Sequence, residues 1–374
     1  MKNIAVIGAG MVGSTIAKDL NDEYKVTAID VDKDKLLQLK ELHKLNIIVE
    51  DISKLKSLKK ILSGFDIIVS AVPGFMGFIT LKKIIEAGKD VADISFFKED
   101  PFELNSLAKK NNVTAVVDCG VAPGLSNIIL GHHNSKMNID SFECFVGGLP
   151  FKRTLPFQYK APFSPIDVIE EYTRPARIVE NRKIIIKSAL SDPELINIDS
   201  VGTLEAFNTD GLRTLLLTMK IPNMKEKTLR YPGHIKNIQF LIDSGFLSDE
   251  EIEFEGKKIK PIVISSKILL PQWKLEPGEA EFTSLVIKIK GKEKKKIVEY
   301  NYGLFDKYDE EKNITSMSRT TGYTCSSIAR RILNKDFSIK GISAPEHIGA
   351  DEKCYSKIMK ELNDRNIILK KQRL

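Results

Sequence analysis

The sequence predicts an α/β protein of two domains: a parallel sheet wrapped by helices, and then an α+β domain with a mainly antiparallel sheet. Three observations predict this fold class. Short β-branched segments alternate with helical patterns up to about residue 125, and longer strands with alternating polarity follow Gly124. The chain of 374 residues is also longer than a single hydrophobic core usually supports.

The expected elements of the first 125 residues are short and alternate regularly. Apolar β-branched runs bounded by turn residues predict strands, and apolar residues three or four positions apart predict the helices between them. This alternation indicates a parallel sheet, because a helix must carry the chain back before the next parallel strand begins. We expect strands at 3–7, 25–29, 46–49, 66–72, 91–94 and 114–118, and helices at 14–20, 34–43, 55–62, 79–87 and 101–110.

A glycine-rich turn joins the first expected strand to the first expected helix. Gly8, Gly10 and Gly13 have the spacing G-x-G-x-x-G, a weak signal alone but a specific one between a strand and a helix. The first glycine permits a tight turn, the second lets the backbone approach a pyrophosphate, and the third lets the helix pack on the strand. Met11 and Val12 offer N–H groups to the phosphates at the helix N-terminus. We therefore predict a Rossmann dinucleotide-binding domain over residues 1–125.

An acidic residue, Asp30, ends the second expected strand, twenty residues after Gly10. A carboxylate at this place accepts hydrogen bonds from the ribose hydroxyls of NAD and repels the 2′-phosphate of NADP. The following residues, Val31, Asp32 and Lys33, include no arginine that would bind such a phosphate. The predicted cofactor is NAD.

Further cofactor contacts are expected where the other strands end, because ligands of doubly wound sheets bind at the carboxyl ends of the strands. Small side chains and backbone groups at these ends would hold the nicotinamide half. We interpret Cys119 as a small packing residue, since a buried thiol is usually inert. The residues concerned are Asp51, Ala71, Val72, Pro73, Cys119 and Gly120.

After Gly124 the expected strands are longer. In Phe282–Lys290, Leu285 and Ile287 fall on one face and Lys288 falls on the other, as is typical of an antiparallel sheet with one face in water. The free face is expected to cover a cofactor or to meet a second subunit, which makes a homodimer the expected assembly. We expect strands at 141–146, 183–187, 262–269, 281–290 and 296–304, and helices at 165–172, 209–219, 325–333 and 351–363.

Composition excludes several classes of protein. Hydrophobic residues make up 42% and charged residues 29%, as in an ordinary globular chain, and the net charge of +7 is scattered along the sequence. The densest basic run, residues 290–296, joins two expected strands and is interpreted as a hairpin tip rather than a nucleic-acid contact. The four cysteines have no C-x-x-C spacing and the five histidines no ligand spacing, so no metal site is expected. We expect a cytoplasmic protein without membrane or nucleic-acid partners.

Four segments beyond residue 118 are more distinctive than the glycine-rich turn. Together they resemble the saccharopine dehydrogenase-like family, most closely its lysine 6-dehydrogenase branch, and the resemblance runs nearly end to end. It implies a second, catalytic domain over 126–317 and a return of the chain to the first domain over 318–374. The segments read DCGVAPGLSN from residue 118, SPIDVIEEYTRPA from 164, LEAFNTDGLRT from 204 and KEKTLRYPGH from 225.

The reaction that this resemblance implies is the oxidation of the ε-carbon of L-lysine by NAD. Hydride leaves that carbon, water hydrolyses the imine, ammonia is released, and the resulting semialdehyde cyclises. The α-carboxylate of lysine needs a cation, and a guanidinium binds a carboxylate bidentately. Arg230, Arg174 and Arg213 are the candidates, with Arg230 the first choice, and a structural ion pair is the alternative for each.

The ε-ammonium must lose a proton before hydride transfer, which requires a base. His234 is the first candidate, its alternative being a structural histidine at the Pro-Gly turn, whereas His132 and His133 are expected on the surface. Asp93 would either contact the substrate amine or cap a helix that begins near Ser95. The water that hydrolyses the imine needs a residue to orient it, and the sequence leaves three candidates, Tyr172, Tyr231 and Asp210.

Two other functions are compatible with parts of the sequence. A saccharopine dehydrogenase would oxidise the same carbon–nitrogen bond with glutamate attached, and its substrate carries two further carboxylates. A nucleotide-sensing regulator would share the pattern of the first domain but would not need the segments between residues 118 and 234. The small-molecule substrate is therefore expected to be lysine or saccharopine.

Overall fold

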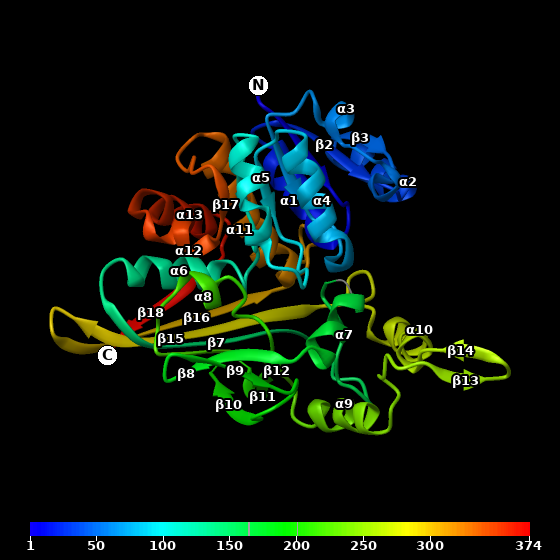
Figure 1. Ribbon diagram of the computed structural model, residues 1–374, viewed down its shortest axis with the longest axis vertical. Coiled ribbons are helices and arrows are strands. Elements are labelled where there is room, and N and C mark those ends of the chain that lie inside the picture. The colour runs from blue at the N-terminus through cyan, green and yellow to red at the C-terminus, as the bar shows by residue number, and fades with distance from the viewer. Residues whose placement is uncertain (164, 200) are drawn as a thin grey trace. The chain divides into compact units, whose positions relative to one another are not determined.

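The computed structural model of the chain contains two compact units (Figure 1). It describes residues 1–163, 165–199 and 201–374, so that Ser164, which opens one of the four quoted segments, lies outside the described residues. Each unit is built from two stretches of the chain, and the chain passes between the units three times. The first unit is Met1–Asn138 with Met317–Ile368, and the second is Ile139–Ser316 with Leu369–Leu374.

The strands of the first unit form one parallel sheet. They are β1 (Asn3–Ile7), β2 (Lys25–Asp30), β3 (Asn46–Val49), β4 (Ile67–Ser70), β5 (Val91–Asp93), β6 (Thr114–Val116) and β17 (Gly341–Ser343). Their order is β17-β6-β5-β4-β1-β2-β3, so the strand order reverses between β1 and β4. Ile7 pairs with Ile29 of β2 and with Ser70 of β4, which brings three carboxyl ends to one edge. This doubly wound topology confirms the predicted Rossmann fold.

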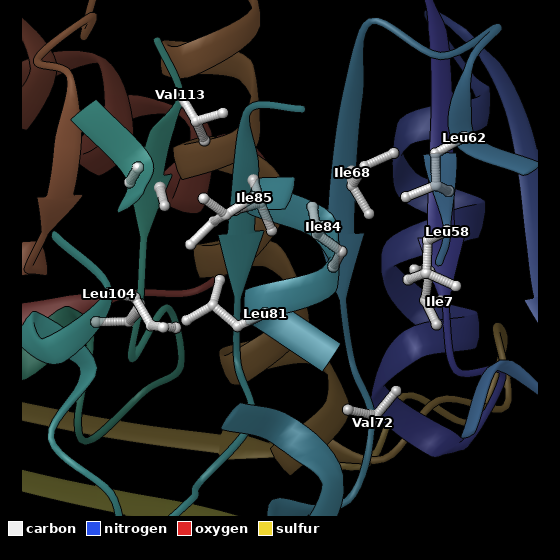
Figure 2. Close-up of a cluster of buried hydrophobic side chains, with 14 of the residues drawn as sticks. Ile7, Leu58, Leu62, Ile68, Val72, Leu81, Ile84, Ile85, Leu104 and Val113 are labelled. Carbon is white, nitrogen blue, oxygen red and sulfur yellow. The ribbon is translucent and has the colours of Figure 1, made fainter. Parts of the chain in front are cut away.

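Helices surround this sheet and enclose an aliphatic core. They are α1 (Met11–Asn21), α2 (Lys33–His43), α3 (Lys59–Leu62), α4 (Gly74–Glu86), α5 (Asn105–Lys110), α6 (Leu125–Asn134), α11 (Ser316–Leu333), α12 (Pro345–Ala350) and α13 (Glu352–Asp364), with the 3₁₀ turns η1 (Ile52–Lys54) and η2 (Pro101–Leu104). Figure 2 shows part of the core, where Ile84 of α4 lies near Ile68 of β4 and Leu81 of α4 lies near Leu104. Strands buried on both faces are apolar throughout, which is why their sequences lack alternation.

Helix α11 is fixed to the start of the first unit by ion pairs. The Arg330 side chain is 3% exposed and pairs with Asp19 of α1 at 3.0 Å and with Glu23 at 2.9 Å. Arg365, which follows α13, pairs with the same Asp19 at 2.5 Å. Elements that are more than 290 residues apart in sequence therefore share one buried carboxylate.

The second unit is built on a nine-stranded, mainly antiparallel sheet, as the sequence predicts. Its strands are β7 (Asn138–Pro150), β8 (Ala176–Glu180), β9 (Lys183–Lys187), β10 (Glu194–Ile198), β11 (Gly202–Asn208), β12 (Asn223–Arg230), β15 (Glu281–Glu293), β16 (Lys296–Lys307) and β18 (Leu369–Arg373). The order is β10-β11-β12-β7-β15-β16-β18, with β8 bound to β12 and to β9. β12 runs parallel to β7, whereas β15 and β16 form a long antiparallel hairpin.

Four helices and a small hairpin complete the described part of this unit. Tyr172, Ile238 and Trp273, one from each of three helices, pack together with Phe207 of the sheet in a second apolar core. Among the described residues, no helix combines the length and hydropathy that a membrane span requires. The elements are α7 (Pro165–Thr173), α8 (Leu215–Thr218), α9 (His234–Asp243), α10 (Pro261–Trp273), β13 (Ile252–Phe254) and β14 (Lys257–Ile259).

The strand predicted at 262–269 is wrong, because these residues lie inside helix α10. Pro261 opens the helix at its first position, where the missing N–H has no intrahelical role. Ser265, Leu269 and Trp273 are the buried residues, at spacings of four, as one face of a helix requires. The other positions of the helix are also mostly apolar, so the sequence shows no helical period of polar and apolar residues.

The helix predicted at 209–219 is confined to the four residues of α8. Gly211 lies so close to the carboxyl group of Glu226 that a Cβ would be 2.1 Å from Oε2. Arg213 has a φ of 44°, in the left-handed region. These two positions force a turn where the apolar pattern alone favours a helix.

The predicted surface location of His132 and His133 is also wrong. Both lie in the last turn of α6 and are only 7% and 4% exposed. The ring of His132 stacks on Tyr355 of α13 with centroids 3.6 Å apart, and its Nδ1 is 3.5 Å from a carboxylate oxygen of Glu352. Helix α6, which is not among the helices expected from the sequence, thus packs the ring of His132 against α13.

Candidate functional site

Two glycines give the turn between β1 and α1 its shape. Gly8 has a φ of 96°, and a Cβ at this position would lie 2.3 Å from the carbonyl oxygen of Ala71. A Cβ on Gly13 would lie 2.0 Å from the carbonyl oxygen of Gly8. The strand, the helix and the segment after β4 therefore meet backbone to backbone, which only glycine allows.

Gly10 has a different environment. No atom lies within 4 Å of the place where its Cβ would be, and its φ of −67° is open to any residue. It is the N-cap of α1, so the N–H groups of Met11, Val12 and Gly13 lie in the first turn, at the positive end of the helix. Open space beside such a helix end fits the pyrophosphate of a dinucleotide.

The carboxylate of Asp30 is fixed beside this turn by two backbone groups. Its Oδ2 accepts a hydrogen bond from the N–H of Ala9 at 2.6 Å, and its Oδ1 accepts one from the N–H of Asp32 at 2.9 Å. The side chain is partly exposed. A fixed acceptor at the end of β2 is suited to ribose hydroxyls and disfavours a phosphate there.

The segment after β4 lies against the same turn. The carbonyl of Ala71 faces Gly8, Val72 is 8% exposed, and Pro73 is the N-cap of α4. Asp51 lies after β3, where it caps η1 by accepting a hydrogen bond from the N–H of Ser53 at 3.1 Å. Ala71 to Pro73 thus border the turn, whereas the carboxylate of Asp51 is engaged in its own local cap.

Two buried side chains lie at the ends of β5 and β6. Asp93 Oδ1 accepts a hydrogen bond from the N–H of Ser95 at 2.6 Å, in a local turn that no helix follows. The N–H of Cys119 donates to the carbonyl oxygen of Asp93 at 2.9 Å, and its thiol faces the carbonyl oxygen of Val116 at 3.3 Å. Burial raises the pKa of Cys119 well above its ordinary value, which opposes a nucleophilic thiolate. The next residue is Gly120, where an added Cβ would lie 3.1 Å from the carbonyl oxygen of Pro123.

In the second unit the fold brings Arg230, Tyr172 and His234 together in one hydrogen-bonded chain. The Nε of Arg230 donates to Tyr172 Oη at 3.1 Å, and this oxygen lies 2.8 Å from His234 Nε2. His234 Nδ1 is 2.8 Å from the carbonyl oxygen of Phe157. Because a carbonyl can only accept, Nδ1 carries the proton, and Tyr172 donates to Nε2.

These three side chains are at most 2% exposed, and burial controls their charge. Burial, together with the positive charge of Arg230, lowers the pKa of His234 to about 3, so the imidazole is neutral at physiological pH. Burial raises the pKa of Tyr172. Arg230 also pairs with Glu171 at 2.7 Å and lies over the ring of Tyr159, 4.2 Å from its centroid.

The other two candidate arginines lie beside helices α7 and α8. Arg174 pairs with Glu170 at 2.9 Å, one helical turn earlier in α7. Arg213 is 6% exposed and lies in the turn before α8.

Asp210 and Tyr231 also have defined partners. Asp210 accepts hydrogen bonds from Arg177 through both carboxylate oxygens, each at 2.8 Å. Tyr231 Oη donates to the carbonyl oxygen of Pro150 at 2.9 Å. These contacts give both side chains hydrogen-bond partners within the second unit.

Two acids, the half-buried Glu171 and the buried Glu226, are functional candidates that the sequence analysis missed. Glu226 is 5% exposed and accepts a hydrogen bond from Thr209 Oγ1 at 2.7 Å. Burial, opposed by Thr209, raises its pKa to about 8, so it is largely protonated at neutral pH. Both acids lie inside the quoted segments, Glu171 directly before Tyr172 and Glu226 four residues before Arg230, and that position is the available signal. Within the described residues, no three His, Cys, Asp or Glu side chains are grouped as a metal ion would need.

A doubly wound sheet with this turn, followed by an α+β unit inserted before the sheet's last strand, is typical of two-domain dinucleotide-dependent dehydrogenases. Comparison with family models gives the same class. The saccharopine dehydrogenase NADP binding domain matches residues 4–116, and the saccharopine dehydrogenase C-terminal domain matches residues 120–368. The chain belongs to the saccharopine dehydrogenase family, and its residues 4–116 are that family's nicotinamide dinucleotide-binding domain.

Individual relatives agree with this assignment. The chain is 25% identical to the alpha-aminoadipic semialdehyde synthase of Arabidopsis thaliana over 72% of its own length and 27% of the relative. It is 26% identical to the saccharopine dehydrogenase [NADP(+), L-glutamate-forming] of Pyricularia oryzae over 68% of its length and 60% of the relative. The chain thus spans between about a quarter and three fifths of these proteins. The apo saccharopine dehydrogenase (L-Glu forming) of Saccharomyces cerevisiae has the same fold, with a TM-score of 0.79 and 19% identity over the full length of both chains.

Proposed function

We propose that this protein is a nicotinamide dinucleotide-dependent dehydrogenase that oxidises the carbon carrying the ε-nitrogen of lysine. The observation that carries this proposal is the open space at Gly10 beside the N-terminus of α1, in a chain matched over both units by saccharopine dehydrogenase models. When bound, the cofactor supplies the hydride acceptor. The N–H groups of Met11, Val12 and Gly13 would hold its pyrophosphate.

NAD is the proposed cofactor. Asp30 supports it, because its carboxylate is fixed beside the turn by the N–H groups of Ala9 and Asp32. The name of the matching family model and that of the fungal relative mention NADP, which makes the choice worth a direct test.

Free L-lysine is the first proposed substrate, and saccharopine is the second. The charge pattern favours lysine, which carries one carboxylate, because Arg230 and Arg174 are already paired with acids of α7. Saccharopine carries three carboxylates and would need more cations. The names of the relatives favour saccharopine. In either case hydride leaves the carbon, water adds to the imine, and the amine departs as ammonia or as glutamate.

Within this proposal, Arg230, Tyr172 and His234 are positioning residues. Their hydrogen-bonded chain joins β12, α7 and α9 to the carbonyl of Phe157. Each polar atom of the chain faces another buried polar atom, so the network orders the segments that carry the family motifs.

Incubation of the purified protein with each substrate and each dinucleotide tests the function. We expect reduced nicotinamide and ammonia in equal amounts from lysine with NAD, and Gly10→Ala should form both more slowly when NAD is below saturation, because it should bind the dinucleotide at least about tenfold more weakly. Formation of glutamate from saccharopine, with no reaction of lysine, would select the second substrate. If neither amine reduces either dinucleotide, the proposal is wrong.

Substitution of Asp30 tests the cofactor. Asp30→Ser removes the acceptor of the ribose hydroxyls and the charge that repels a 2′-phosphate, so the ratio of NAD to NADP affinity should fall roughly tenfold or more. Asp32→Ser is the matched control, because Asp32 caps α2 through the N–H of Lys35 at 3.1 Å. An equal ratio in wild type and Asp30→Ser would show that Asp30 does not select the cofactor.

A further inference from the structure

Glu226 of β12 is a buried acid that forms no ion pair with any lysine or arginine among the described residues. The two acids that act on it electrostatically do have such partners. Glu171 pairs with Arg230 at 2.7 Å, and Asp210 pairs with Arg177 at 2.8 Å. A buried carboxylate is costly unless a cation or several hydrogen bonds compensate its charge. The charged form of Glu226 therefore lacks a cation that the described residues do not supply.

Uncharged groups hold this carboxyl group in place. Thr209 Oγ1 lies 2.7 Å from Oε2 of Glu226 and 2.9 Å from Thr228 Oγ1. A Cβ on Gly211 would lie 2.1 Å from the same Oε2, so the turn after β11 passes directly beside the carboxyl group. Every second residue of a strand faces the same side, so Glu226, Thr228 and Arg230 share one face of β12.

The electrostatic surroundings of Glu226 favour a cation beside it. Burial raises the pKa of Glu226 to about 8, and the charges of Glu171 and Asp210 add to this effect. A cation close to the carboxyl group would reverse it, because an opposite charge favours the ionised form. The titratable or charged residues on the elements around Glu226 are Glu171 of α7, Asp210 after β11, Cys144 of β7 and Arg230 of β12.

We propose that Glu226 binds the ε-ammonium group of the amine substrate and accepts its proton. This inference rests on the proposed function, which requires a base for that ammonium group. Both ring nitrogens of His234 are engaged in hydrogen bonds, and arginines hold Glu171 and Asp210. The proton passes from nitrogen to a carboxylate oxygen of Glu226 and leaves a neutral amine. Hydride can then leave the ε-carbon as the nitrogen lone pair forms the carbon–nitrogen double bond.

The binding of lysine should release a proton at pH 7. In the separate molecules Glu226 and the ε-ammonium group each carry a proton, whereas the bound pair shares one. Roughly one proton should be released at pH 7, and the number should fall towards zero near pH 9, where free Glu226 is already ionised. Lysine affinity should rise by up to about tenfold per pH unit below the pKa of Glu226 and level off above it.

Isothermal titration calorimetry of wild type with NADH and L-lysine, in buffers with different enthalpies of ionisation, counts the released protons without any variant. L-norleucine has the same groups on its α-carbon but no ε-nitrogen, so it should bind without this proton release. Lysine that binds with no proton release at pH 7 would overturn the proposal, and so would a wild type that binds no lysine. Neither result depends on turnover, so the assay of reduced nicotinamide decides the proposed function separately.

The variant Glu226→Gln tests the same inference in the protein. Its amide keeps the shape and an acceptor for Thr209 but takes up no proton, so lysine affinity should fall at least about tenfold and kcat about 100-fold or more. Norleucine affinity should not change. Glu143→Gln is the matched control, because Glu143 pairs with Lys225 at 3.1 Å on the other face of the sheet. Equal lysine affinity and proton release in Glu226→Gln and wild type would overturn the proposal.

Discussion

Substitutions of Gly10 and Gly13 by alanine should have different effects, the first on cofactor binding and the second on stability. In Gly10→Ala the new Cβ meets no protein atom within 4 Å, so we expect an unfolding free energy equal to that of wild type or higher by about 0.5 kcal/mol. Dinucleotide affinity should fall at least about tenfold, because the methyl group occupies the space where the pyrophosphate approaches. In Gly13→Ala the Cβ would meet the Gly8 carbonyl, so stability itself should fall by about 1–3 kcal/mol. Urea unfolding and titration with NADH measure the two effects, and tight binding by Gly10→Ala would contradict this interpretation.

The buried His234 makes stability depend on pH. In the unfolded chain a histidine has a pKa of about 6.5, whereas burial lowers the pKa of His234 to about 3 in the folded protein. Below pH 6.5 the unfolded state therefore binds a proton that the folded state does not. This contribution to stability is complete above pH 6.5 and is lost as the pH falls towards 3, by up to roughly 1.4 kcal/mol per pH unit.

The variant His234→Gln isolates this contribution. It should be less stable than wild type at pH 7, because the chain from Tyr172 to Phe157 is broken. Between pH 6 and 4 the unfolding free energy of the variant should fall less steeply than that of wild type. The difference in slope should be up to roughly 1.4 kcal/mol per pH unit, the value for one proton. Urea unfolding at a series of pH values provides the measurement, and parallel curves would mean that His234 titrates normally in the folded state.

At the scale of elements, helix α11 depends on its buried arginine. Replacing Arg330 by Met leaves Asp19 with one cation fewer in a buried place, where its side chain is 8% exposed. Breaking such a pair costs about 3–5 kcal/mol. Lys335→Met is the matched control, since Lys335 is 64% exposed in its pair with Asp90 and should change stability by less than about 1 kcal/mol. A similar loss of stability in both variants would show that the burial of Arg330 does not explain the cost of replacing it.

The elements that the sequence predicted well are those whose polarity has a period. The strands β1, β2 and β3 and the hairpin of β15 and β16 follow from apolar runs and from alternation. Both faces of helix α10 are apolar, so no period distinguishes helix from strand, and the sequence alone predicts a strand there. The sequence alone predicts a helix in the segment before α8, because the close contact of Gly211 with Glu226 is tertiary and has no local pattern.

The candidate site was predictable to a similar degree. Gly8, Gly10, Gly13 and Asp30 lie close together because one turn and two adjacent strands carry them, and local spacing determines that arrangement. The partners in the second unit were not predictable. Whether Arg230 binds a substrate or Glu171 depends on how α7 packs on β12. The spacing of residues in the sequence does not determine this packing.

At the scale of the whole molecule, the proposed reaction needs both units, because the turn belongs to the first and three of the four distinctive segments to the second. The ε-ammonium of lysine has an ordinary pKa of about 10.4, and only the neutral amine can release hydride. The rate with saturating lysine should therefore rise from pH 7 towards pH 10, by up to about tenfold per pH unit where deprotonation controls it. Initial rates of NADH formation provide the measurement, and a flat profile would show that another step is limiting.

The three crossings of the chain between the units have a consequence for how the protein folds. The strand β17 joins the first unit after more than 200 intervening residues, and β18 completes the edge of the second sheet only at residues 369–373. During synthesis neither sheet can acquire its last strand until β17 and β18 have been made. Contacts so distant in sequence slow folding, and the early segments must wait with unpaired strand edges. We expect this protein to be most prone to aggregation during synthesis, and to resist aggregation once β17 and β18 have joined their sheets.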